Sequence, residues 1–361
     1  MNKPKLLTPG PVEVGDKVLY AQAQKMISHR GRLFQQVYSE TTGMLEEMSN
    51  AEEALIYAGS GTTAVDAMIW SLIEPGSNVL VIVTGEFGRR LEATIRARGV
   101  EVMKLESNPG EPVEPYLIQD AIDKYKPDYL AIVHNETSTG LAYRNLEKIA
   151  QYASEAGAKT LVDTVSGFPA EKLELNKTGI FAAATCSHKA LAAPPGLAIN
   201  LLSREAVKYL EKTDPPGIPP SINLYKNHKF YLERRETPYT PPVTLIQALQ
   251  TSLTEIMKKE MNKFRVEHEE RASILYGKLP ELGFRTLVSK KEYRSNTVTA
   301  FYTPENVGAK QIATYLLEKG YNISTGIGKL KDNVVRIGIM GHITREDLYA
   351  ILRELESVTH T

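Results

Sequence analysis

The stretch NVLVIVTGEFGRRLEATIRARGVEVMKLE, residues 78–106, has the pattern that decides the fold. Its first part, NVLVIVTG (78–85), is a near-continuous apolar run, which predicts a buried β-strand. FGRRLEATIRARG (87–99) then has helical spacing and stops at Gly99, and VEVMKLE (100–106) predicts a second strand. Strand, helix and strand in this order form the repeating unit of a parallel sheet.

The same alternation extends on both sides of this stretch. We expect further strands at 52–59, 128–134, 159–164 and 181–185, and helices at 62–73, 115–125 and 146–157. This repetition predicts an α/β fold whose mostly parallel sheet is covered by helices on both faces. Ligands of such sheets bind at the carboxyl ends of the strands, so we expect the functional site there.

The length of the chain predicts more than one domain, because 361 residues are too many for one compact core. A proline-rich connection at 211–220 is followed by helical patterns over 244–282, strands at 297–303 and 334–340, and helices at 308–319 and 345–357. We therefore expect an amino-terminal arm over residues 1–20, a large domain over 21–250 and a smaller α+β domain over 251–361.

Composition favours a cytoplasmic protein and gives no sign of a nucleic-acid or membrane partner. The 43 basic and 43 acidic residues cancel, which does not favour nucleic acid or a membrane surface as a partner. The most apolar run, residues 79–83, is too short to span a bilayer, and the amino terminus has no apolar core of signal-peptide length. The single cysteine, Cys186, excludes an intrachain disulfide and a multi-cysteine metal site, so we expect a reducing compartment and no metal.

Three of the expected strand ends carry groups suited to binding a ligand. GSGTTAVDA (59–67) combines glycines with a helix start, which favours an anion, although a capped tight turn explains it equally. GEFGRR (85–90) offers the face of a phenylalanine to a planar ligand, unless this aromatic belongs to the core. HNETSTG (134–140) offers hydroxyl and amide donors, unless it only caps the next helix.

Asp163, Lys189 and Arg336 are charged residues in apolar surroundings. Asp163 ends a strand, which indicates either a buried carboxylate that needs a partner or a helix cap. The small and apolar neighbours of Lys189 favour a lowered pKa and a nucleophilic amine, with extension into water as the alternative. Arg336 needs an anion, which is either a ligand carboxylate or an internal partner. Because ligand-type residues occur at five consecutive strand ends, we interpret them as one site.

Together these motifs resemble those of the class V aminotransferases, pyridoxal-phosphate enzymes of fold type I, and within them the alanine/serine–glyoxylate (serine–pyruvate) branch. The resemblance runs along nearly the whole chain, through LLTPGP (6–11), SHRG (28–31), GSGT (59–62), GEFGRR, HNETSTG, VDTVSG (162–167), SHKALAAPPG (187–196), TPYTPPV (237–243) and VRIG (335–338). It implies a large domain with a mostly parallel seven-stranded sheet, a smaller α+β carboxy-terminal domain, pyridoxal 5'-phosphate as cofactor and a homodimer. The implied reaction transfers an amino group from alanine or serine to glyoxylate or pyruvate.

The resemblance also implies roles for individual residues around the cofactor ring. Lys189 would form the Schiff base, and Asp163 would pair with the pyridine nitrogen. Phe87 would stack on one face of the ring, Val165 would lie against the other, and Thr137 would bond the ring hydroxyl.

The remaining implied contacts concern the phosphate and the substrate. The phosphate would be held by Ser60, Gly61, Thr62 and His188, joined by Tyr239 and Thr240 from the second subunit. Arg336 would bind the substrate carboxylate. His29 and Arg30 of SHRG are expected near the site, and we interpret them as a surface basic pair without an assigned role.

Three other functions remain open from the sequence. A pyridoxal-phosphate lyase or desulfurase would share the fold, but a desulfurase needs a cysteine on a mobile loop and Cys186 lies at a strand end just before Lys189. A 2-aminoethylphosphonate–pyruvate transaminase is compatible, because Arg336 could hold a phosphonate. A non-enzymatic binding protein with a degenerate site would not need both Lys189 and Asp163.

Overall fold

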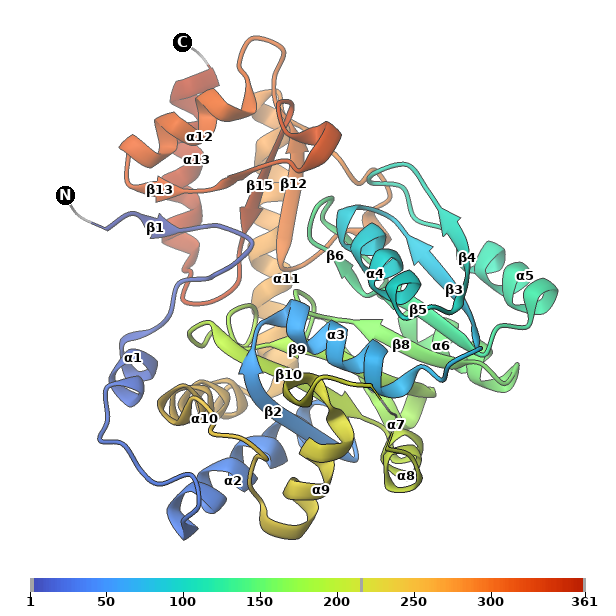
Figure 1. Cartoon of the computed structure of the whole chain (residues 1–361). Coiled ribbons are helices and arrows are strands. Elements are labelled where there is room, and N and C mark those ends of the chain that lie inside the picture. Colours follow the sequence, from blue (N-terminus) through green and yellow to red (C-terminus); the bar gives the residue numbers. More distant parts are fainter. Residues whose placement is uncertain (1–2, 215–216, 360–361) are drawn as a thin grey trace.

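The computed structural model describes residues 3–214 and 217–359 of the chain (Figure 1). Residues 1 and 2 of the expected arm, and Pro215 and Pro216 of the expected proline-rich connection, lie outside the described residues. Within the described ranges, no helix is both long enough and apolar enough to cross a membrane.

A seven-stranded sheet forms the centre of the larger part, in the order β2, β10, β9, β8, β5, β3, β4 (Figure 1). Its strands are β2 (Glu53–Gly59), β3 (Asn78–Val83), β4 (Glu101–Glu106), β5 (Tyr129–Val133), β8 (Lys159–Asp163), β9 (Ile180–Cys186) and β10 (Gly196–Leu202). β10 runs antiparallel to β2 and β9, and the other neighbouring pairs are parallel. Every residue of β5 and β9 is buried, as in sheets covered on both faces. The expected mostly parallel sheet is confirmed.

Helices connect and cover these strands. They are α1 (Asp16–Gln22), α2 (Arg32–Ser49), α3 (Gly61–Leu72), α4 (Glu86–Ala97), α5 (Pro115–Tyr125), α6 (Leu146–Glu155), α7 (Leu175–Thr178), α8 (Arg204–Lys212), α9 (Leu224–Arg234) and α10 (Val243–Lys258). α3 packs against β9 and β10, α4 against β3 and β5, and α6 against β8 and β9. Apolar side chains on one stripe of each helix, such as Met68 of α3 and Ile95 of α4, are fully buried in the same core as the strands.

β10 is a strand that the alternation of strands and helices does not predict. Pro194 and Pro195 interrupt the apolar pattern before it, and no helix separates it from β9, so it returns antiparallel. The short connection between β9 and β10 carries His188 and Lys189. A shorter hairpin, β6 (Asn135–Glu136) and β7 (Leu141–Ala142), follows β5.

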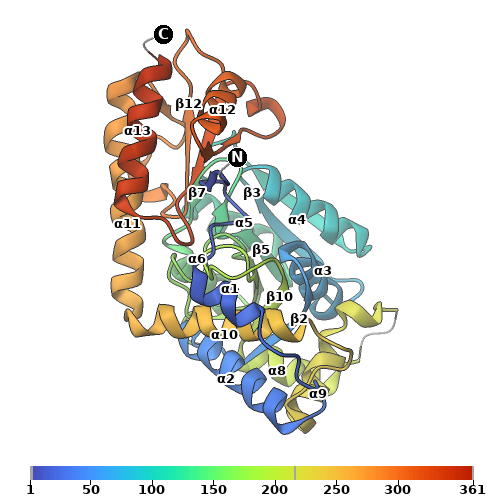
Figure 2. The same cartoon turned by 90° about the vertical axis from the view of Figure 1, so that its left-hand side faces the viewer.

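The smaller part has its own antiparallel sheet and its own core. The sheet order is β11 (Arg285–Thr286), β12 (Val298–Tyr302), β15 (Val334–Gly338) and β14 (Ser324–Thr325), and the helices are α11 (Met261–Lys278), α12 (Ala309–Glu318) and α13 (Arg345–Thr359). Figure 2 shows α11 rising from the end of α10 to lie beside α13. The helical patterns over 244–282 thus belong mainly to two helices, α10 and α11, which separate at Glu260, where φ is +61°.

The segment of residues 5–13, which we call the strap, connects the smaller part to the larger one. Its strand β1 (Lys5–Leu6) pairs with β13 (Tyr321–Asn322), and the N–H of Gly338 donates to the carbonyl of Leu7 at 2.7 Å. A Cβ on Gly338 would lie 2.1 Å from the carbonyl oxygen of Thr8, so this close approach requires glycine. The middle of the strap then reaches the connection between β9 and β10.

Candidate active site

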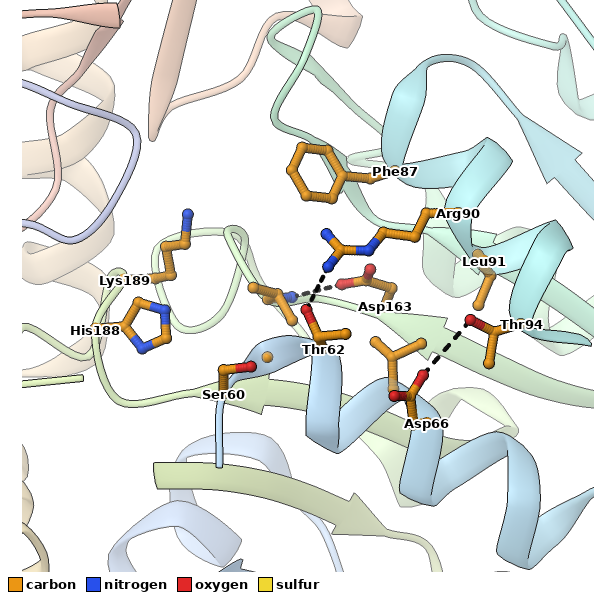
Figure 3. A pocket seen from close by; sticks show the side chains of 13 residues that line it. Ser60, Thr62, Asp66, Phe87, Arg90, Leu91, Thr94, Asp163, His188 and Lys189 are labelled. Atoms are coloured by element: carbon orange, nitrogen blue, oxygen red, sulfur yellow. Dashed lines mark hydrogen bonds between the residues drawn. The ribbon is translucent and has the colours of Figure 1, made fainter. Parts of the chain in front are cut away.

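A cavity of about 180 Å³ lies at the carboxyl ends of β2, β3, β8 and β9 (Figure 3). Its lining residues are Ser60, Gly61, Thr62, Val65, Asp66, Phe87, Arg90, Leu91, Thr94, Asp163, Val165, His188 and Lys189. Eight of these are among the residues that the sequence analysis expected around a cofactor: Ser60, Gly61, Thr62, Phe87, Asp163, Val165, His188 and Lys189. Segments separated by more than a hundred residues therefore meet at one edge of the sheet.

The start of α3 forms one wall of the cavity. Ser60 is the N-cap, in extended conformation, and its backbone N–H donates to the hydroxyl of Thr63 at 3.0 Å. The structure thus contains the capped turn, and the same turn exposes the N-terminal end of a helix to the cavity, which favours an anion. A Cβ on Gly61 would lie 2.7 Å from the side chain of Val165, so glycine allows the two segments to pack here.

The turn that carries Phe87 is held by a buried carboxylate that the sequence analysis did not identify. Glu136 is fully buried and accepts hydrogen bonds from the backbone N–H groups of Phe87 at 3.2 Å and Gly88 at 2.9 Å. Burial raises the pKa of Glu136, while these N–H groups and Ser138 oppose the rise. A carboxylate at the start of α4 also satisfies helix N–H groups that have no partner within the helix.

Asp163 is the last residue of β8 and is 7% exposed. Its Oδ1 accepts a hydrogen bond from the N–H of Val165 at 2.9 Å. Burial raises the pKa of Asp163 to about 6, although this hydrogen bond and the charges of Lys189 and Arg90 act in the opposite direction. The carboxylate is therefore in an environment where a cationic partner would be strongly favoured.

Lys189 lies across the cavity from Asp163 in Figure 3, and its Nζ donates to the carbonyl oxygen of Pro9 in the strap at 2.6 Å. Burial, together with the charge of Arg336, lowers the pKa of Lys189, while Cys186 and Asp163 act to raise it. The lowered pKa that the apolar neighbours of Lys189 predict is confirmed in direction. A lysine amine with a lowered pKa is nucleophilic toward a carbonyl.

His188 and Cys186 both lie close to Lys189. Burial and the charge of Lys189 lower the pKa of His188 to about 4, so its imidazole is neutral at physiological pH. Cys186 is fully buried in β9, and burial raises the pKa of its thiol to about 12. Such a thiol is not a nucleophile, which argues against a desulfurase.

Thr137 and Arg336 lie next to each other but do not line this cavity. Thr137 is buried and its hydroxyl shares a hydrogen bond of 2.6 Å with that of Ser166. Arg336, on β15, donates from Nη1 to the carbonyl of Thr137 at 3.2 Å and from Nε to the carbonyl of Thr325 at 2.9 Å. Burial lowers the pKa of Arg336 to about 10, so the guanidinium stays charged at neutral pH.

Tyr239 and Thr240 are exposed and do not line the cavity of their own chain. The segment before them is held by Arg30, whose guanidinium donates to Glu236 at 2.7 Å and to the carbonyls of Thr237 at 2.7 Å and Pro238 at 3.0 Å. Arg30 is exposed at the surface, as expected, and in addition it braces this loop.

Asp66, Arg90 and Thr94 line the cavity although the sequence analysis assigned them no role. Asp66 follows Thr62 by one helical turn on α3, and Arg90 follows Phe87 by three positions on α4. Residues three or four apart share a helix face, so this spacing was a usable signal in the sequence.

The residues present fit pyridoxal phosphate. Lys189 offers an amine for an aldehyde, and Asp163 offers a carboxylate for a ring nitrogen. Phe87 and Val165 offer apolar surface for a flat ring, and the start of α3 offers N–H groups for a phosphate.

Comparison with known proteins gives the same assignment. The family model "Aminotransferase class-V" matches residues 16–351. An uncharacterised aminotransferase of Methanocaldococcus jannaschii is 34% identical over 98% of this chain and 92% of its own length. An aspartate aminotransferase structure from Thermus thermophilus is 31% identical with a TM-score of 0.90, over 99% of each chain. An alanine–glyoxylate aminotransferase structure from Nostoc sp. is 29% identical with a TM-score of 0.94, over 99% of this chain and 96% of that one. The chain belongs to the class V aminotransferases and is therefore an enzyme of the pyridoxal-phosphate-dependent, fold type I group.

Proposed function

We propose that this enzyme transfers an amino group from alanine or serine to glyoxylate or pyruvate, with Lys189 as the residue that holds the cofactor covalently. The observation that carries the proposal is that the amine of Lys189 and the buried carboxyl of Asp163 face one cavity. The reactive end of a lysine and an acid for the ring nitrogen are the two groups that this cofactor needs from a protein.

The part played by Asp163 follows from its position. When bound, pyridoxal phosphate withdraws electrons from the Cα of the substrate, which loosens the Cα–H bond. Asp163 would hold a proton on the ring nitrogen, because a carboxylate at contact distance favours a protonated partner by roughly 1–3 pKa units. The buried setting of Asp163 strengthens this pairing, since little water competes with it.

Lys189 would also move the proton at Cα. Its lowered pKa keeps a larger fraction of the amine neutral, and only a neutral amine can accept a proton. A base positioned in this way contributes about 10²–10⁴-fold to the rate. The carbonyl of Pro9 would orient the amine whenever it is free.

Arg336 would bind the carboxylate of the substrate. Two of its nitrogens donate to the carbonyls of Thr137 and Thr325, and the third, Nη2, has no hydrogen-bond partner among residues 3–214 and 217–359. The two carbonyls fix the guanidinium plane, and carboxylates bind guanidinium groups in that plane. The side chain is mostly buried, so the ion pair would be only weakly screened by water.

We further propose a homodimer in which Tyr239 and Thr240 of one subunit complete the phosphate site of the other. Thr62 and Arg90 are exposed, so the cavity is open to solvent at the end where a phosphate would lie. Large exposed apolar side chains occur on α1, on the segment up to the start of α2, on α9 and on the following loop: Leu19, Tyr20, Met26, Leu33, Leu232 and Tyr239. A subunit interface that includes these elements would bury these side chains, and apolar side chains of this kind are typical of the centre of such interfaces.

A mixing experiment tests the shared site. Lys189→Ala and Tyr239→Ala variants are purified separately, unfolded together and refolded as a mixture. In a shared-site dimer, the hybrid has one cavity with both Lys189 and Tyr239, so the mixture regains activity that neither variant has alone. Activity equal to the sum of the two separate variants would contradict the shared site.

The covalent role of Lys189 is tested with borohydride. The enzyme loaded with cofactor is reduced and digested, and the peptides are examined for a pyridoxyl group. We expect the group on Lys189 and none in Lys189→Ala, while Lys263→Ala, which changes an exposed lysine of α11, keeps it. A tag on another peptide, or no tag in the unsubstituted enzyme, would refute the proposal.

The donor is tested in single turnovers, read from the absorbance of the cofactor. Alanine, serine, aspartate and 2-aminoethylphosphonate are each mixed with the enzyme, and the acceptors glyoxylate and pyruvate are then added in turn. We expect fast bleaching with alanine or serine. Fast bleaching with aspartate would instead indicate the amino donor named for the Thermus thermophilus aspartate aminotransferase. Fast bleaching with 2-aminoethylphosphonate would indicate that Arg336 binds a phosphonate group. Release of product without any oxo-acid acceptor would indicate a lyase.

We also propose that the enzyme works in the cytoplasm. The sequence has one cysteine, Cys186, which is fully buried, and a chain without an intrachain disulfide is compatible with this reducing compartment.

A further inference from the structure

Arg90 lies at the opening of the cavity, on the same face of α4 as Phe87. Its Nη2 donates to the hydroxyl of Thr62 at 2.6 Å, and its guanidinium carbon lies 5.9 Å from the centre of the Phe87 ring. Figure 3 shows the guanidinium pointing into the cavity between Phe87 and Thr62. Within the described residues, the bond to Thr62 is the one hydrogen bond that the Arg90 side chain makes, so most of its five N–H donors remain available.

The cavity contains few other positive charges. Among the described residues that line it, the basic side chains are Arg90, His188 and Lys189. His188 is neutral at physiological pH because burial lowers its pKa to about 4, and Lys189 lies on the opposite side from Arg90 in Figure 3. Arg90 is therefore the permanent charge at the end of the cavity that the start of α3 forms.

The hydrogen bond to Thr62 also determines what the Thr62 hydroxyl can do. A hydroxyl has one proton and two lone pairs. Since Arg90 donates to the oxygen, the proton of the hydroxyl is free to point toward an anion in the cavity. Arg90 thus supplies hydrogen-bond donors of its own and also leaves the Thr62 hydroxyl available as a donor to the anion.

Asp66 has the opposite effect on an anion. It lies one turn below Thr62 on α3, lines the same cavity, and its carboxylate is 3.5 Å from the hydroxyl of Thr94. Burial raises the pKa of Asp66, while the charge of Arg90 lowers it. The two charges therefore influence each other, and Asp66 both repels an anion and attracts the guanidinium that would bind it.

We propose that Arg90 binds the phosphate of the cofactor and that Asp66 weakens this binding, so that the pair sets the preference for pyridoxal phosphate over unphosphorylated pyridoxal. This inference rests on the proposed cofactor site at Lys189. It assigns a cofactor-binding role to Arg90 and a tuning role to Asp66, through the charge balance around one phosphate group.

The test compares how tightly the cofactor-free enzyme binds pyridoxal phosphate and unphosphorylated pyridoxal. Dissociation constants for pyridoxal phosphate and pyridoxal are measured by absorbance titration for the unsubstituted enzyme and for Arg90→Gln, Arg90→Lys and Asp66→Asn. The matched control is Arg89→Gln, because Arg89 is the neighbouring arginine but bonds Glu86 at 2.6 Å and Glu106 at 3.0 Å outside the cavity.

We expect Arg90→Gln to raise the dissociation constant of pyridoxal phosphate roughly 10- to 100-fold, because charge-assisted hydrogen bonds are lost. The dissociation constant of pyridoxal should change by less than about 2-fold. Arg90→Lys should show an intermediate loss, because it keeps the charge without the planar fork. Asp66→Asn should bind pyridoxal phosphate more tightly, and Arg89→Gln should leave the ratio of the two constants unchanged.

Two results would overturn the inference while leaving the proposed function intact. An equal loss for both ligands in Arg90→Gln would show that Arg90 acts on the ring site or on folding. A loss in Asp66→Asn that matches the loss in Arg90→Gln would show that the two residues form a structural pair. If Arg90→Gln does not fold, the ratio in Arg90→Lys decides, and an unchanged ratio rejects the role of Arg90. Failure of the proposed function is seen separately, as the absence of a borohydride-stable tag on Lys189.

Discussion

Replacing Asp163 by Asn should make the cofactor-free enzyme more stable and the working enzyme much slower. The pKa of Asp163 in the folded chain is about 6, against an ordinary value of 3.8. The folded state thus holds this proton more tightly than the unfolded state does. Between pH 3.8 and about 6, the contribution of Asp163 to the free energy of unfolding must fall as pH rises, because this residue binds more protons in the folded chain than in the unfolded chain.

The size of the effect follows from the shift. A difference of about 2 pKa units is equivalent to about 3 kcal/mol at 1.36 kcal/mol per unit, and this penalty is complete above pH 6. Asn has nearly the same shape, and its oxygen can still accept the hydrogen bond from Val165, but it carries no charge. At pH 8 the free energy of unfolding of the variant should therefore exceed that of the unsubstituted chain by up to about 3 kcal/mol.

The assay is urea denaturation of cofactor-free protein at several values of pH from 4 to 8. The difference between Asp163→Asn and the unsubstituted chain should be small at pH 4 and reach its maximum above pH 6. Asp120→Asn, on an exposed side chain of α5, should show no such pH-dependent gain. The same Asp163 variant, loaded with cofactor, should transaminate roughly 10- to 1,000-fold more slowly, because the ring nitrogen would lose the ionic partner that we propose for it.

A difference in stability that does not depend on pH would refute this reasoning, since it would mean that the Asp163 carboxylate is not penalised by burial. A gain in stability without any loss of turnover would contradict the second part of the prediction, the proposed role of Asp163 at the ring nitrogen.

Two further substitutions test the strap and the turn at Phe87. In Gly10→Ala the new Cβ would lie 2.5 Å from Nζ of Lys189, on a residue whose φ is +133°. We therefore expect a stability loss of about 1–3 kcal/mol and slower attachment of the cofactor. Gly277→Ala, in open space on α11, should not slow attachment, and equal attachment rates in the two variants would contradict the contact. Glu136→Gln leaves one oxygen for the N–H groups at the start of α4, so urea unfolding should show a loss of about 1–3 kcal/mol, and an unchanged midpoint would exclude this bracing role.

The parallel part of the sheet was predictable because its strands are buried on both faces. β3 and β5 are therefore short, nearly continuous apolar runs, and helices with clear periodicity separate them. β10 was not predictable from this pattern, since two prolines precede it and it pairs antiparallel without a helix before it. The strap was hidden for another reason: β1 has only two residues, and its partner β13 lies near the other end of the sequence.

The same distinction applies to the site. Lys189 and Asp163 could be found because a charged residue among apolar neighbours contradicts its surroundings. Arg90 and Asp66 lie on helix faces where charged residues are ordinary, so only the folded arrangement shows that they share a cavity. The carbonyl of Pro9 has no signature in a sequence, because every residue has one. Tyr239 and Thr240 stay a prediction, since their expected partner is another chain.

The strap has a consequence for the order in which the enzyme is assembled. The carbonyl of Pro9 contacts Lys189 across 180 positions of sequence. The strap itself is held by β13, Gly338 and Gly341, which are synthesised after all the strands of the large sheet. The large sheet could therefore form on the ribosome while its reactive lysine is still unrestrained. The final arrangement around that amine awaits completion of the smaller part, so an unfinished chain would carry Lys189 and Asp163 without the contact between the strap and Lys189.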